Sequence, residues 1–308
     1  MKYIKSEEFH LENTAVALGK FEGIHRGHQL LLDEIIKQKE NGLQSVVFTF
    51  DMPPRSVLKG ERDYQQIYTK EERHLLLERQ NIDILIEHPF TREFASLEPE
   101  DFVRHVLMEK TGAKAVVVGT DFRFGRKRAG DIHLLEKMAK ECGFQLIIVD
   151  KLKIDHEDVS STRIRSLLKE GQMEEAERLL GRPYSVVGTV VHGKALGRTI
   201  QIPTVNQIVE QEKLVPPNGV YVSRVHVDGE IFYGITNIGV KPTVESHGVK
   251  GIETNIFQFD QDIYGKSIEV ELLHYRRPEM HFSSVGELRA CMTDDISYAK
   301  DYIQQFAG

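Results

Sequence analysis

Two histidines near the start of the chain are placed where imidazole groups can act on phosphate. His25 and His28 flank Gly27 in the segment 19–28, which reads GKFEGIHRGH and lies between an apolar run and a helical pattern. A glycine turn between a strand and a helix lets backbone N–H groups and the helix N-terminus face phosphates. Two imidazoles there can donate hydrogen bonds to a nucleoside triphosphate and stabilise the charge that builds as pyrophosphate leaves. The alternative is a pair of solvated loop histidines.

Two other segments of the first half carry groups suited to the same chemistry. Residues 160–165 read SSTRIR, so hydroxyl groups begin a helical pattern and arginines follow within one turn. Such a helix start can clasp a triphosphate, and plain N-capping with solvated arginines is the alternative. Residues 119–125 read GTDFRFG after an apolar run, so Phe122 and Phe124 can face an aromatic ring there. The alternative for this segment is a solvated basic loop.

The second half contains a basic glycine-rich turn, two neutral oxygen donors and one glutamate of interest. Residues 190–198 read VVHGKALGR, a turn whose backbone amides can wrap a triphosphate. Thr204 and Asn206 follow this turn, and a hydroxyl with an amide carbonyl suits a Mg²⁺ ion that also contacts phosphate. Glu253 begins a later apolar run. A lone glutamate is usually a surface charge, so its candidacy depends on the residues around it.

The first half predicts a doubly wound α/β sheet as the scaffold for these groups. Short apolar runs, rich in β-branched residues, are typical of buried parallel strands and occur at residues 15–18, 46–50, 82–86, 115–118 and 146–149. Helical patterns lie between them and after them, at residues 29–39, 69–80, 100–110, 132–141, 162–169 and 173–180. This alternation indicates a Rossmann-like fold, in which ligands bind beyond the carboxyl ends of the strands.

The pattern changes after residue 182. Long helical patterns stop, and partly alternating runs typical of strands follow at residues 186–191, 220–227, 230–238, 254–259 and 268–275. Asp228 and Gly229 separate two of these runs and predict a tight hairpin. A last helix is expected from about residue 285 to 306, with Ser284 and Glu287 at capping-box spacing. The sequence therefore predicts two domains, an α/β domain over 1–182 and an antiparallel β-barrel with a C-terminal helix over 183–308.

Composition excludes several classes of protein. The 308 residues carry a formal net charge of −7, divided as −3 over residues 1–182 and −4 over residues 183–308, so neither half is a basic module for nucleic acid or an anionic membrane. Apolar runs of about five residues fall far short of the ~20 that span a bilayer. Cys142 and Cys291 form no metal or disulfide pattern, and the start lacks a signal-peptide core, so a cytoplasmic setting is expected. An oligomer is possible.

Taken together, these motifs resemble the bifunctional bacterial riboflavin kinase/FAD synthetase family over nearly the whole chain. The first half is similar to the family's FMN adenylyltransferase domain, a nucleotidyltransferase of the His-x-Gly-His type, and the segment 180–184 resembles its inter-domain joint. The second half is similar to the family's riboflavin kinase barrel, through the segments 192–199, 203–206, 216–221, 237–243 and 262–265. The chain departs from the usual family residues at Glu22, in the segment 52–54 and at Gln201.

The resemblance implies two reactions that use ATP. Riboflavin is phosphorylated to FMN, and FMN is then adenylylated to FAD with release of pyrophosphate. In the kinase, it implies that Glu253 is the general base, that Thr204 and Asn206 hold Mg²⁺ or another divalent cation, and that Arg277 and Glu279 border the flavin. The ATP contacts implied for the kinase are His192, Gly193, Gly197, Arg198, Thr204 and Asn206.

The resemblance also assigns roles in the adenylyltransferase. His25, His28 and Arg165 are implied to be catalytic, by stabilising the charge of the reacting phosphates. The implied ATP contacts are Gly19, Phe21, Gly27, His28, Ser161, Thr162 and Arg165. Asp121 and Phe124 are implied to contact FMN.

Two other functions are open at this point. The chain could be a riboflavin kinase whose adenylyltransferase half has drifted, as the departures at Glu22 and Pro53 suggest. It could instead be a flavin- or nucleotide-sensing regulator that binds RNA or a protein, although the acidic charge of both halves argues against RNA. The substrates expected are small molecules, with no nucleic-acid or membrane partner.

Overall fold

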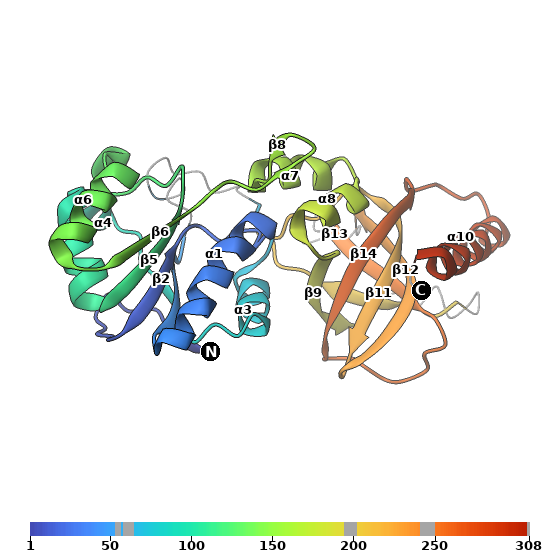
Figure 1. Cartoon of the computed structure of the whole chain (residues 1–308). Coiled ribbons are helices and arrows are strands. Elements are labelled where there is room, and N and C mark those ends of the chain that lie inside the picture. Colours follow the sequence, from blue (N-terminus) through green and yellow to red (C-terminus); the bar gives the residue numbers. More distant parts are fainter. Residues whose placement is uncertain (53–56, 58–64, 194–201, 241–249, 307–308) are drawn as a thin grey trace. The chain divides into compact units, whose positions relative to one another are not determined.

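The computed structural model (Figure 1) describes residues 1–52, 57, 65–193, 202–240 and 250–306, and the chain divides into two compact units. The first unit comprises Met1–Tyr64 and Lys70–Ser160, and the second comprises Gln65–Thr69 and Ser161–Gly308. The chain therefore leaves the first unit for five residues and then returns to it. The division at residue 182 lies inside the second unit, and as a division of functions it stays a prediction.

The first unit is built on a six-stranded sheet, in which all neighbouring strands are parallel. In chain order the strands are β1 (Lys2–Ile4), β2 (Thr14–Leu18), β3 (Gln44–Phe50), β4 (Ile84–His88), β5 (Ala113–Gly119) and β6 (Gln145–Val149). Their spatial order is β1-β4-β3-β2-β5-β6. The chain moves to one side of β2 for β3 and β4, and to the other side for β5 and β6. The switch point therefore lies between β2 and β5, where such sheets form their ligand crevice.

Helices cover both faces of this sheet, so the predicted doubly wound α/β fold is confirmed. One face buries Val16, Val116 and neighbouring residues against Phe102 and Leu135. The helix α1 packs against β2, β3 and β5, and buries Leu32. Among its described residues, the helical segments are α1 (Arg26–Lys37), η1 (Gln38–Asn41), α3 (Lys70–Arg79), α4 (Arg92–Ala95), α5 (Pro99–Asp101), the π-helical η2 (Phe102–Lys110), η3 (Arg126–Arg128) and α6 (Ile132–Cys142). The short strands β7 (Lys153–Ile154) and β8 (Glu157–Asp158) pair with each other.

The second unit contains a closed barrel of six antiparallel strands, as the sequence predicted. In chain order the strands are β9 (Tyr184–Val191), β10 (Val205–Ile208), β11 (Gly219–Val227), β12 (Glu230–Val240), β13 (Lys250–Ile256) and β14 (Ser267–Arg277). They close in the order β10-β13-β12-β11-β14-β9. The predicted hairpin turn joins β11 to β12, and Asp228 and Gly229 have φ values of 51° and 86° there. Positive φ at both central residues is the geometry of a tight two-residue hairpin.

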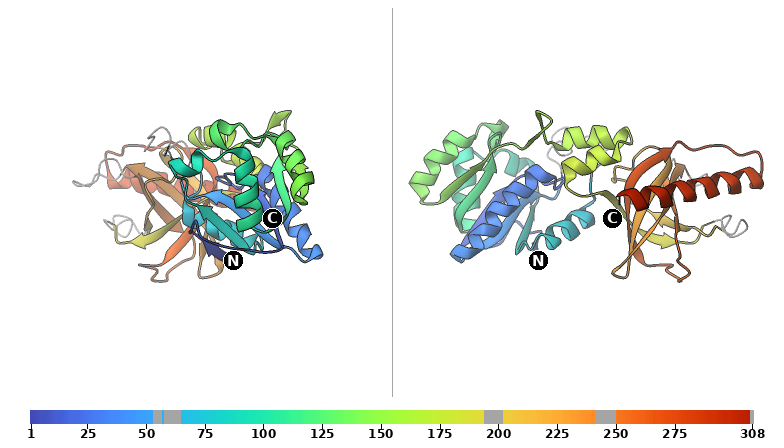
Figure 2. Two further views of the ribbon diagram at one scale, coloured as in Figure 1. Left: turned by 90° about the vertical axis from the view of Figure 1, so that its left-hand side faces the viewer. Right: turned by 45° about the vertical axis from the view of Figure 1, so that its right-hand side comes forward.

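Within the described part of the second unit, three helices accompany the barrel. They are α7 (Ser161–Lys169), α8 (Met173–Leu180) and α10 (Val285–Phe306), and Figure 2 shows α10 running alongside the strands. The helix α8 packs against β9 and β14, while α10 packs against β11 and β12 and buries Ala299 there. Ser284 Oγ accepts a hydrogen bond from Glu287 N–H at 3.2 Å, which caps the start of α10. The C-terminal helix is therefore confirmed at its predicted position.

The five-residue segment 65–69 is attached to the barrel by a buried lysine. Lys213 Nζ donates hydrogen bonds to Ile67 O at 3.0 Å and to Ser185 O at 2.7 Å. It also lies 4.5 Å and 4.4 Å from the ring centroids of Tyr68 and Tyr184. Leu214 N–H donates to Gln66 O at 2.7 Å. This short segment of the first half is therefore an integral part of the second unit.

Candidate active sites

The first candidate site begins at the N-terminus of α1. His25 caps this helix, and its Nδ1 accepts a hydrogen bond from His28 N–H at 3.3 Å. Because that nitrogen accepts, it carries no proton, and the neutral ring must carry its proton on Nε2. The His25 Nε2–H is therefore a donor. The cap thus fixes both the helix start and the tautomer of the first histidine.

The two histidine rings are stacked, with centroids 3.7 Å apart and planes 15° apart. Gly27 permits this arrangement, because a methyl group there would lie 3.2 Å from His25 Nδ1. Phe21 lies beside His28 at 5.1 Å between ring centroids. It is buried and has a φ of 44°, an uncommon value for a bulky residue. The turn that carries the histidines is therefore held by burial in a conformation that a free loop would rarely adopt.

The sheet topology brings a second predicted segment near this turn. Gly19 follows β2 and donates its N–H to Phe48 O at 3.3 Å. Residues 120–124 follow β5, which pairs with β2. The turn after β2 and the segment after β5 therefore flank the switch point of the sheet. Asp121 is exposed there and pairs with Lys151 at 3.1 Å, and its carboxylate, with that of Asp158, raises the pKa of Lys151.

Phe124 is placed differently from its neighbour Phe122. Phe124 is only 6% exposed and belongs to the hydrophobic core, where its ring lies 5.5 Å from that of Phe102. Phe122 is partly buried and stacks on Phe124, with ring centroids 5.6 Å apart. The core position leaves Phe124 as a support for Phe122, and a direct contact between Phe124 and FMN stays a prediction.

The predicted hydroxyl and arginine group begins α7. Ser161 is the first residue of this helix and Thr162 is exposed at its second position. Arg165 Nη1 donates to Ser161 O at 3.4 Å. These residues belong to the second unit, whereas His25 and His28 belong to the first. The joint action of the two groups on one ATP stays a prediction.

The second candidate site lies on one row of residues around the barrel. The register pairs Asn206 of β10 with Glu253 of β13, Glu253 with Asn237 of β12, Asn237 with Val220 of β11, and Val220 with Arg277 of β14. Directly opposed residues of antiparallel strands have Cβ atoms roughly 4.5–5.5 Å apart. Three residues that are far apart in the sequence, Asn206, Glu253 and Arg277, therefore lie at one level of the barrel.

The row faces outward. The hydroxyl of Thr236 bonds to those of Ser223 and Thr254 at 2.8 and 2.9 Å, and all three side chains are fully buried. Ile235, beside Thr236 on β12, packs instead with Ala299 of α10 on the outer surface. Alternation along β12 and β13 then places Asn237 and Glu253 on that outer surface. The candidate site is thus a surface feature of the barrel and not part of its interior.

Asn206 is packed against the turn that was predicted to cover a triphosphate. Its side chain is 5% exposed, and a methyl group on Gly193 would lie 2.6 Å from Asn206 Cγ. Thr204 stands two residues earlier, directly before β10. His192, the residue before Gly193, stacks on the ring of Tyr264 with centroids 3.7 Å apart. Gly197 and Arg198, also predicted to contact ATP, lie outside the described residues.

Glu279 lies close to the same row. Its Oε2 accepts a hydrogen bond from Asn218 Nδ2 at 2.9 Å. A methyl group on Gly239 would lie 3.0 Å from Glu279 Cδ, so a larger residue there would displace this carboxylate. Gly239 is two residues after Asn237 on β12 and shares its outward face. Asn206, Glu253, Asn237 and Glu279 therefore form one polar surface.

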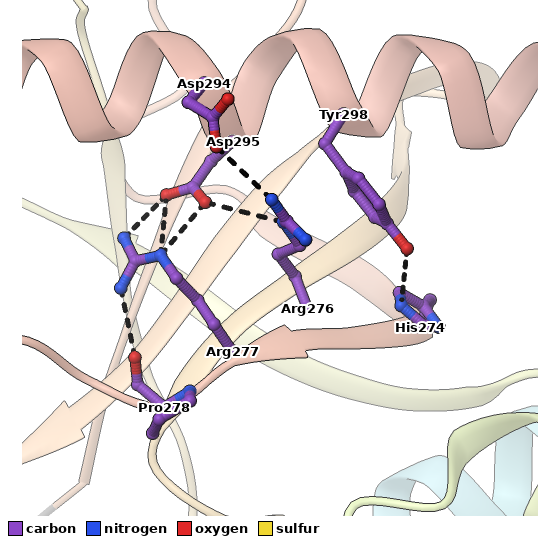
Figure 3. A network of polar contacts seen from close by, with 7 residues as sticks. All are labelled: His274, Arg276, Arg277, Pro278, Asp294, Asp295 and Tyr298. Atoms are coloured by element: carbon purple, nitrogen blue, oxygen red, sulfur yellow. Dashed lines mark hydrogen bonds and ion pairs between the residues drawn. The ribbon is translucent and has the colours of Figure 1, made fainter.

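Arg277 is engaged by the C-terminal helix. Its guanidinium donates to both carboxylate oxygens of Asp295, which is buried on α10 (Figure 3). This ion pair occupies the guanidinium. A role of Arg277 at the flavin stays a prediction.

The sequence did not single out Asn218, Asn237 and Asp295 as site residues. Asn218 and Asn237 lie in segments with recognisable turn and strand patterns. Their approach to Glu253 and Glu279, however, depends on pairing between strands that are distant in sequence. Asp295 is one of many charged residues in a helical pattern. Only the packing of α10 distinguishes it from them.

Two family models match the two parts of the chain. The model described as FAD synthetase matches residues 7–163, and the model described as riboflavin kinase matches residues 180–303. The N-terminal match includes the His25–His28 turn, and the C-terminal match includes the row that contains Glu253.

Curated relatives match over nearly their full length. The bifunctional riboflavin kinase/FMN adenylyltransferase of Listeria monocytogenes is 37% identical, over 95% of this chain and 93% of its own. Proteins of the same name from Buchnera aphidicola and Escherichia coli are 35% and 33% identical, each over 94% of this chain and over 94% and 93% of their own.

One solved structure also matches nearly the whole chain. It is a Streptococcus pneumoniae protein described as a macrolide-efflux protein, with 31% identity, a TM-score of 0.85, and coverage of 99% of this chain and 98% of that one. Among the described residues of the present chain, no helix is long and apolar enough to cross a membrane. The two family models and the curated relatives agree with each other, and the chain therefore belongs to the bifunctional riboflavin kinase/FMN adenylyltransferase family and converts riboflavin to FMN and FMN to FAD.

Proposed function

We propose that the two reactions occur at two separate sites, with adenylyl transfer by residues 1–182 and riboflavin phosphorylation by residues 183–308. The observation that carries this proposal is the row on the barrel, which gathers Asn206, Glu253 and Asn237 on one outward surface. Phosphoryl transfer to a hydroxyl group uses a base that takes the proton and oxygen donors that hold a metal ion at the phosphates. This surface places both kinds of group side by side. The stacked histidines at the start of α1 are a second, distinct constellation suited to a triphosphate.

In the kinase reaction, Glu253 acts as general base. Its carboxylate takes the proton of the ribityl 5′-hydroxyl of riboflavin while that oxygen attacks the γ-phosphate of ATP, and ADP leaves. Glu253 is half-buried between Asn206 and Asn237, so neighbouring strands hold it in place. His192 and Gly193, together with Gly197 and Arg198, cover the triphosphate.

A divalent cation fits the donors next to Glu253. Among the described residues, no three His, Cys, Asp or Glu side chains gather as a metal site, so the ion would depend on neutral oxygens and on phosphate. The Thr204 hydroxyl and the Asn206 carbonyl are oxygen donors of the kind that Mg²⁺ accepts beside phosphate. Asn206 is held by its contact with Gly193. When bound there, Mg²⁺ would neutralise charge on the transferring phosphate.

In the adenylyl transfer, an oxygen of the FMN phosphate attacks the α-phosphate of a second ATP, and pyrophosphate leaves. This nucleophile is already an anion, so positioning and charge stabilisation are sufficient. His25 can donate from Nε2, because its Nδ1 is used by the helix cap. His28 contacts the triphosphate at the start of α1, where Gly19, Phe21 and Gly27 shape the turn, and Asp121 and Phe124 stand on the FMN side. Ser161, Thr162 and Arg165, at the start of α7, carry hydroxyl and guanidinium groups suited to binding ATP.

A chromatographic time course tests these assignments together. The protein is incubated with riboflavin and ATP, with and without Mg²⁺, and the flavins are separated at intervals. The proposal expects FMN first, FAD later, and no product when the cation is chelated. Accumulation of FMN alone would support a chain with only the kinase activity, and unchanged riboflavin would support a sensor. Product formation in excess chelator would contradict the proposed role of Thr204 and Asn206.

The setting of the enzyme is also a proposal. Both cysteines, Cys142 and Cys291, are free thiols, which suits a reducing compartment. We place the enzyme in the cytoplasm, with small-molecule substrates as its partners. Cell fractionation followed by a flavin assay checks this placement, and activity in a membrane pellet would oppose it.

A further inference from the structure

The helix α10 is joined to the end of β14 by an ion pair whose aspartate is buried. Arg277 Nε donates to Asp295 Oδ1 at 3.0 Å, and Arg277 Nη2 donates to Asp295 Oδ2 at 2.6 Å (Figure 3). The Asp295 side chain is 1% exposed. Such a two-pronged pair fixes the plane of the guanidinium as well as its position. The orientation of Arg277 is therefore set by Asp295.

The same guanidinium reaches the backbone that follows β14. Arg277 Nη1 donates to Pro278 O at 3.0 Å, which fixes the peptide that leads into Glu279. Glu279 is exposed, and its carboxylate accepts the bond from Asn218 and closely approaches Gly239. An exposed side chain is held weakly by such contacts, because water competes for them. Its position depends on the backbone that carries it.

We propose that Asp295 is a positioning residue of the riboflavin kinase reaction. Acting through Arg277 and the carbonyl of Pro278, it holds the Glu279 carboxylate where riboflavin docks. This inference rests on the proposed kinase site and on the contact between Glu279 and the flavin that the family resemblance implies. Riboflavin presents ribityl hydroxyls and an imide N–H, which are donors, and an ionised carboxylate is an acceptor for them. Asp295 itself is buried between α10 and the barrel and acts only through its neighbours.

The adjacent residue provides a matched control. Asp294 also lies on α10 and forms an ion pair, with Arg276 at 3.2 Å, but its side chain is 73% exposed. Arg276 lies over the ring of Tyr298, 3.9 Å from its centroid. Arg276 Nε also lies 4.0 Å from Asp295 Oδ1, but the link to Pro278 runs through Arg277. Asp294→Asn removes the same charge from the same helix, and we expect it to leave the link from Arg277 to Pro278 and Glu279 in place.

Steady-state kinetics of the full-length protein test the proposal. Asp295→Asn is expected to raise the riboflavin KM roughly tenfold, with kcat and the ATP KM changed by less than about twofold. Asp294→Asn is expected to leave all three constants within about twofold of the unaltered protein. Asp295→Glu, which restores the charge, should recover part of the riboflavin KM. The rate of FAD formation from supplied FMN serves as an internal control and should be unchanged.

A double-mutant cycle with Glu279→Gln separates positioning from general support. If Asp295 acts through Glu279, the riboflavin KM of the double variant should be close to that of Glu279→Gln alone. Full multiplication of the two effects, or an equal loss in kcat and in the ATP KM, would overturn the proposal while leaving the role of Glu279 intact. An unchanged riboflavin KM in Glu279→Gln would instead remove the proposed flavin contact, and the inference with it.

A second variant keeps the test decisive if Asp295→Asn does not fold. Arg277→Lys retains a positive charge for Asp295 but lacks the fork that also reaches the Pro278 carbonyl. It is expected to raise the riboflavin KM in the same way, with a cooperative melt and unchanged adenylylation of FMN. An Arg277→Lys protein that melts normally and keeps the original riboflavin KM would overturn the proposal.

Discussion

Gly193 is a single residue on which the geometry of the proposed kinase site depends. Because Gly193 has no side chain, there is space for the Asn206 amide beside it. A methyl group on Gly193 would lie only 2.6 Å from Asn206 Cγ. Asn206 is buried and cannot move aside at little cost. The position of one proposed cation ligand therefore depends on the absence of a side chain in the neighbouring turn.

Gly193→Ala is expected to lower the rate of FMN formation by about 100-fold or more, because a displacement of about 1 Å at a reacting site can have such an effect. FAD formation from supplied FMN should be unchanged. Gly286→Ala is the control, since a methyl group there meets only Ser284 Oγ at 3.8 Å. Both rates are measured by chromatography of the flavins. Equal rates of FMN formation in the two variants would contradict the placement of Asn206.

The sequence predicted which residues are candidates for the sites more readily than it predicted which residues lie beside them in space. Local spacing is sufficient to recognise the histidines around a glycine. It is also sufficient for the threonine and the asparagine that follow a basic turn. The approach of Asn237 to Glu253 depends instead on the register of β12 and β13. Phe124 also illustrates the limit, because an aromatic residue after a strand can face a ligand or, as in this chain, enter the core.

At the scale of elements, α3 is attached to the sheet of the first unit by a buried carboxylate. Glu87 of β4 is 1% exposed and forms ion pairs with Lys70 at 2.9 Å and Arg73 at 3.1 Å, both on α3. It also accepts a hydrogen bond from Tyr3 of β1. Burial alone would raise the pKa of Glu87, but hydrogen bonds from His74, Tyr3 and Lys70 outweigh it and lower that pKa to about 2.

This network predicts an acid-sensitive contribution to stability. The pKa of Glu87 is depressed in the folded state, to about 2 from an ordinary 4.5, so its contribution is complete above pH 4.5 and is lost as the pH falls toward 2. The size is on the order of 3 kcal/mol. Glu87→Gln should lose this pH dependence and be less stable at pH 7. Urea unfolding at several pH values measures it, with exposed Glu93→Gln as the control. Parallel curves for Glu87→Gln and the unaltered protein would contradict this account.

The segment 65–69 gives a second prediction at this scale. Lys213→Met would remove the donor to Ile67 O and Ser185 O and leave these buried carbonyls with fewer hydrogen bonds, at a cost of about 1–3 kcal/mol. Hydrogen exchange at the Leu214 amide, which donates to Gln66 O, should become faster. Lys266→Met, which removes an exposed pair with Asp228, is the control. Unaltered exchange in Lys213→Met would argue against Lys213 as the anchor.

The long elements could be predicted, and the short ones could not. The apolar runs and helical patterns identified the strands from β2 to β6 and the helix α10. β1 has three residues and β10 has four, which is too short for a periodic pattern. The assembly of α7 and α8 with the barrel was also missed, because the apolar face of α8 does not reveal which partner will cover it.

In the whole molecule, one chain carries two reactions, and its two units alternate along the sequence. The chain passes between the units around residues 64–65, 69–70 and 160–161. The mild negative charge of both halves is consistent with local handling of phosphate, through glycine turns, helix starts and a few placed side chains, and not through an overall basic surface. We propose on these grounds that each reaction has its own site.

Two single variants test this claim most directly. His28→Ala and Glu253→Ala are each assayed for FMN formation from riboflavin and for FAD formation from supplied FMN, with melting curves to show that both proteins are folded. If each reaction has its own site, His28→Ala forms FMN but no FAD, and Glu253→Ala forms FAD from FMN but no FMN from riboflavin. Loss of both activities in either folded variant would contradict it.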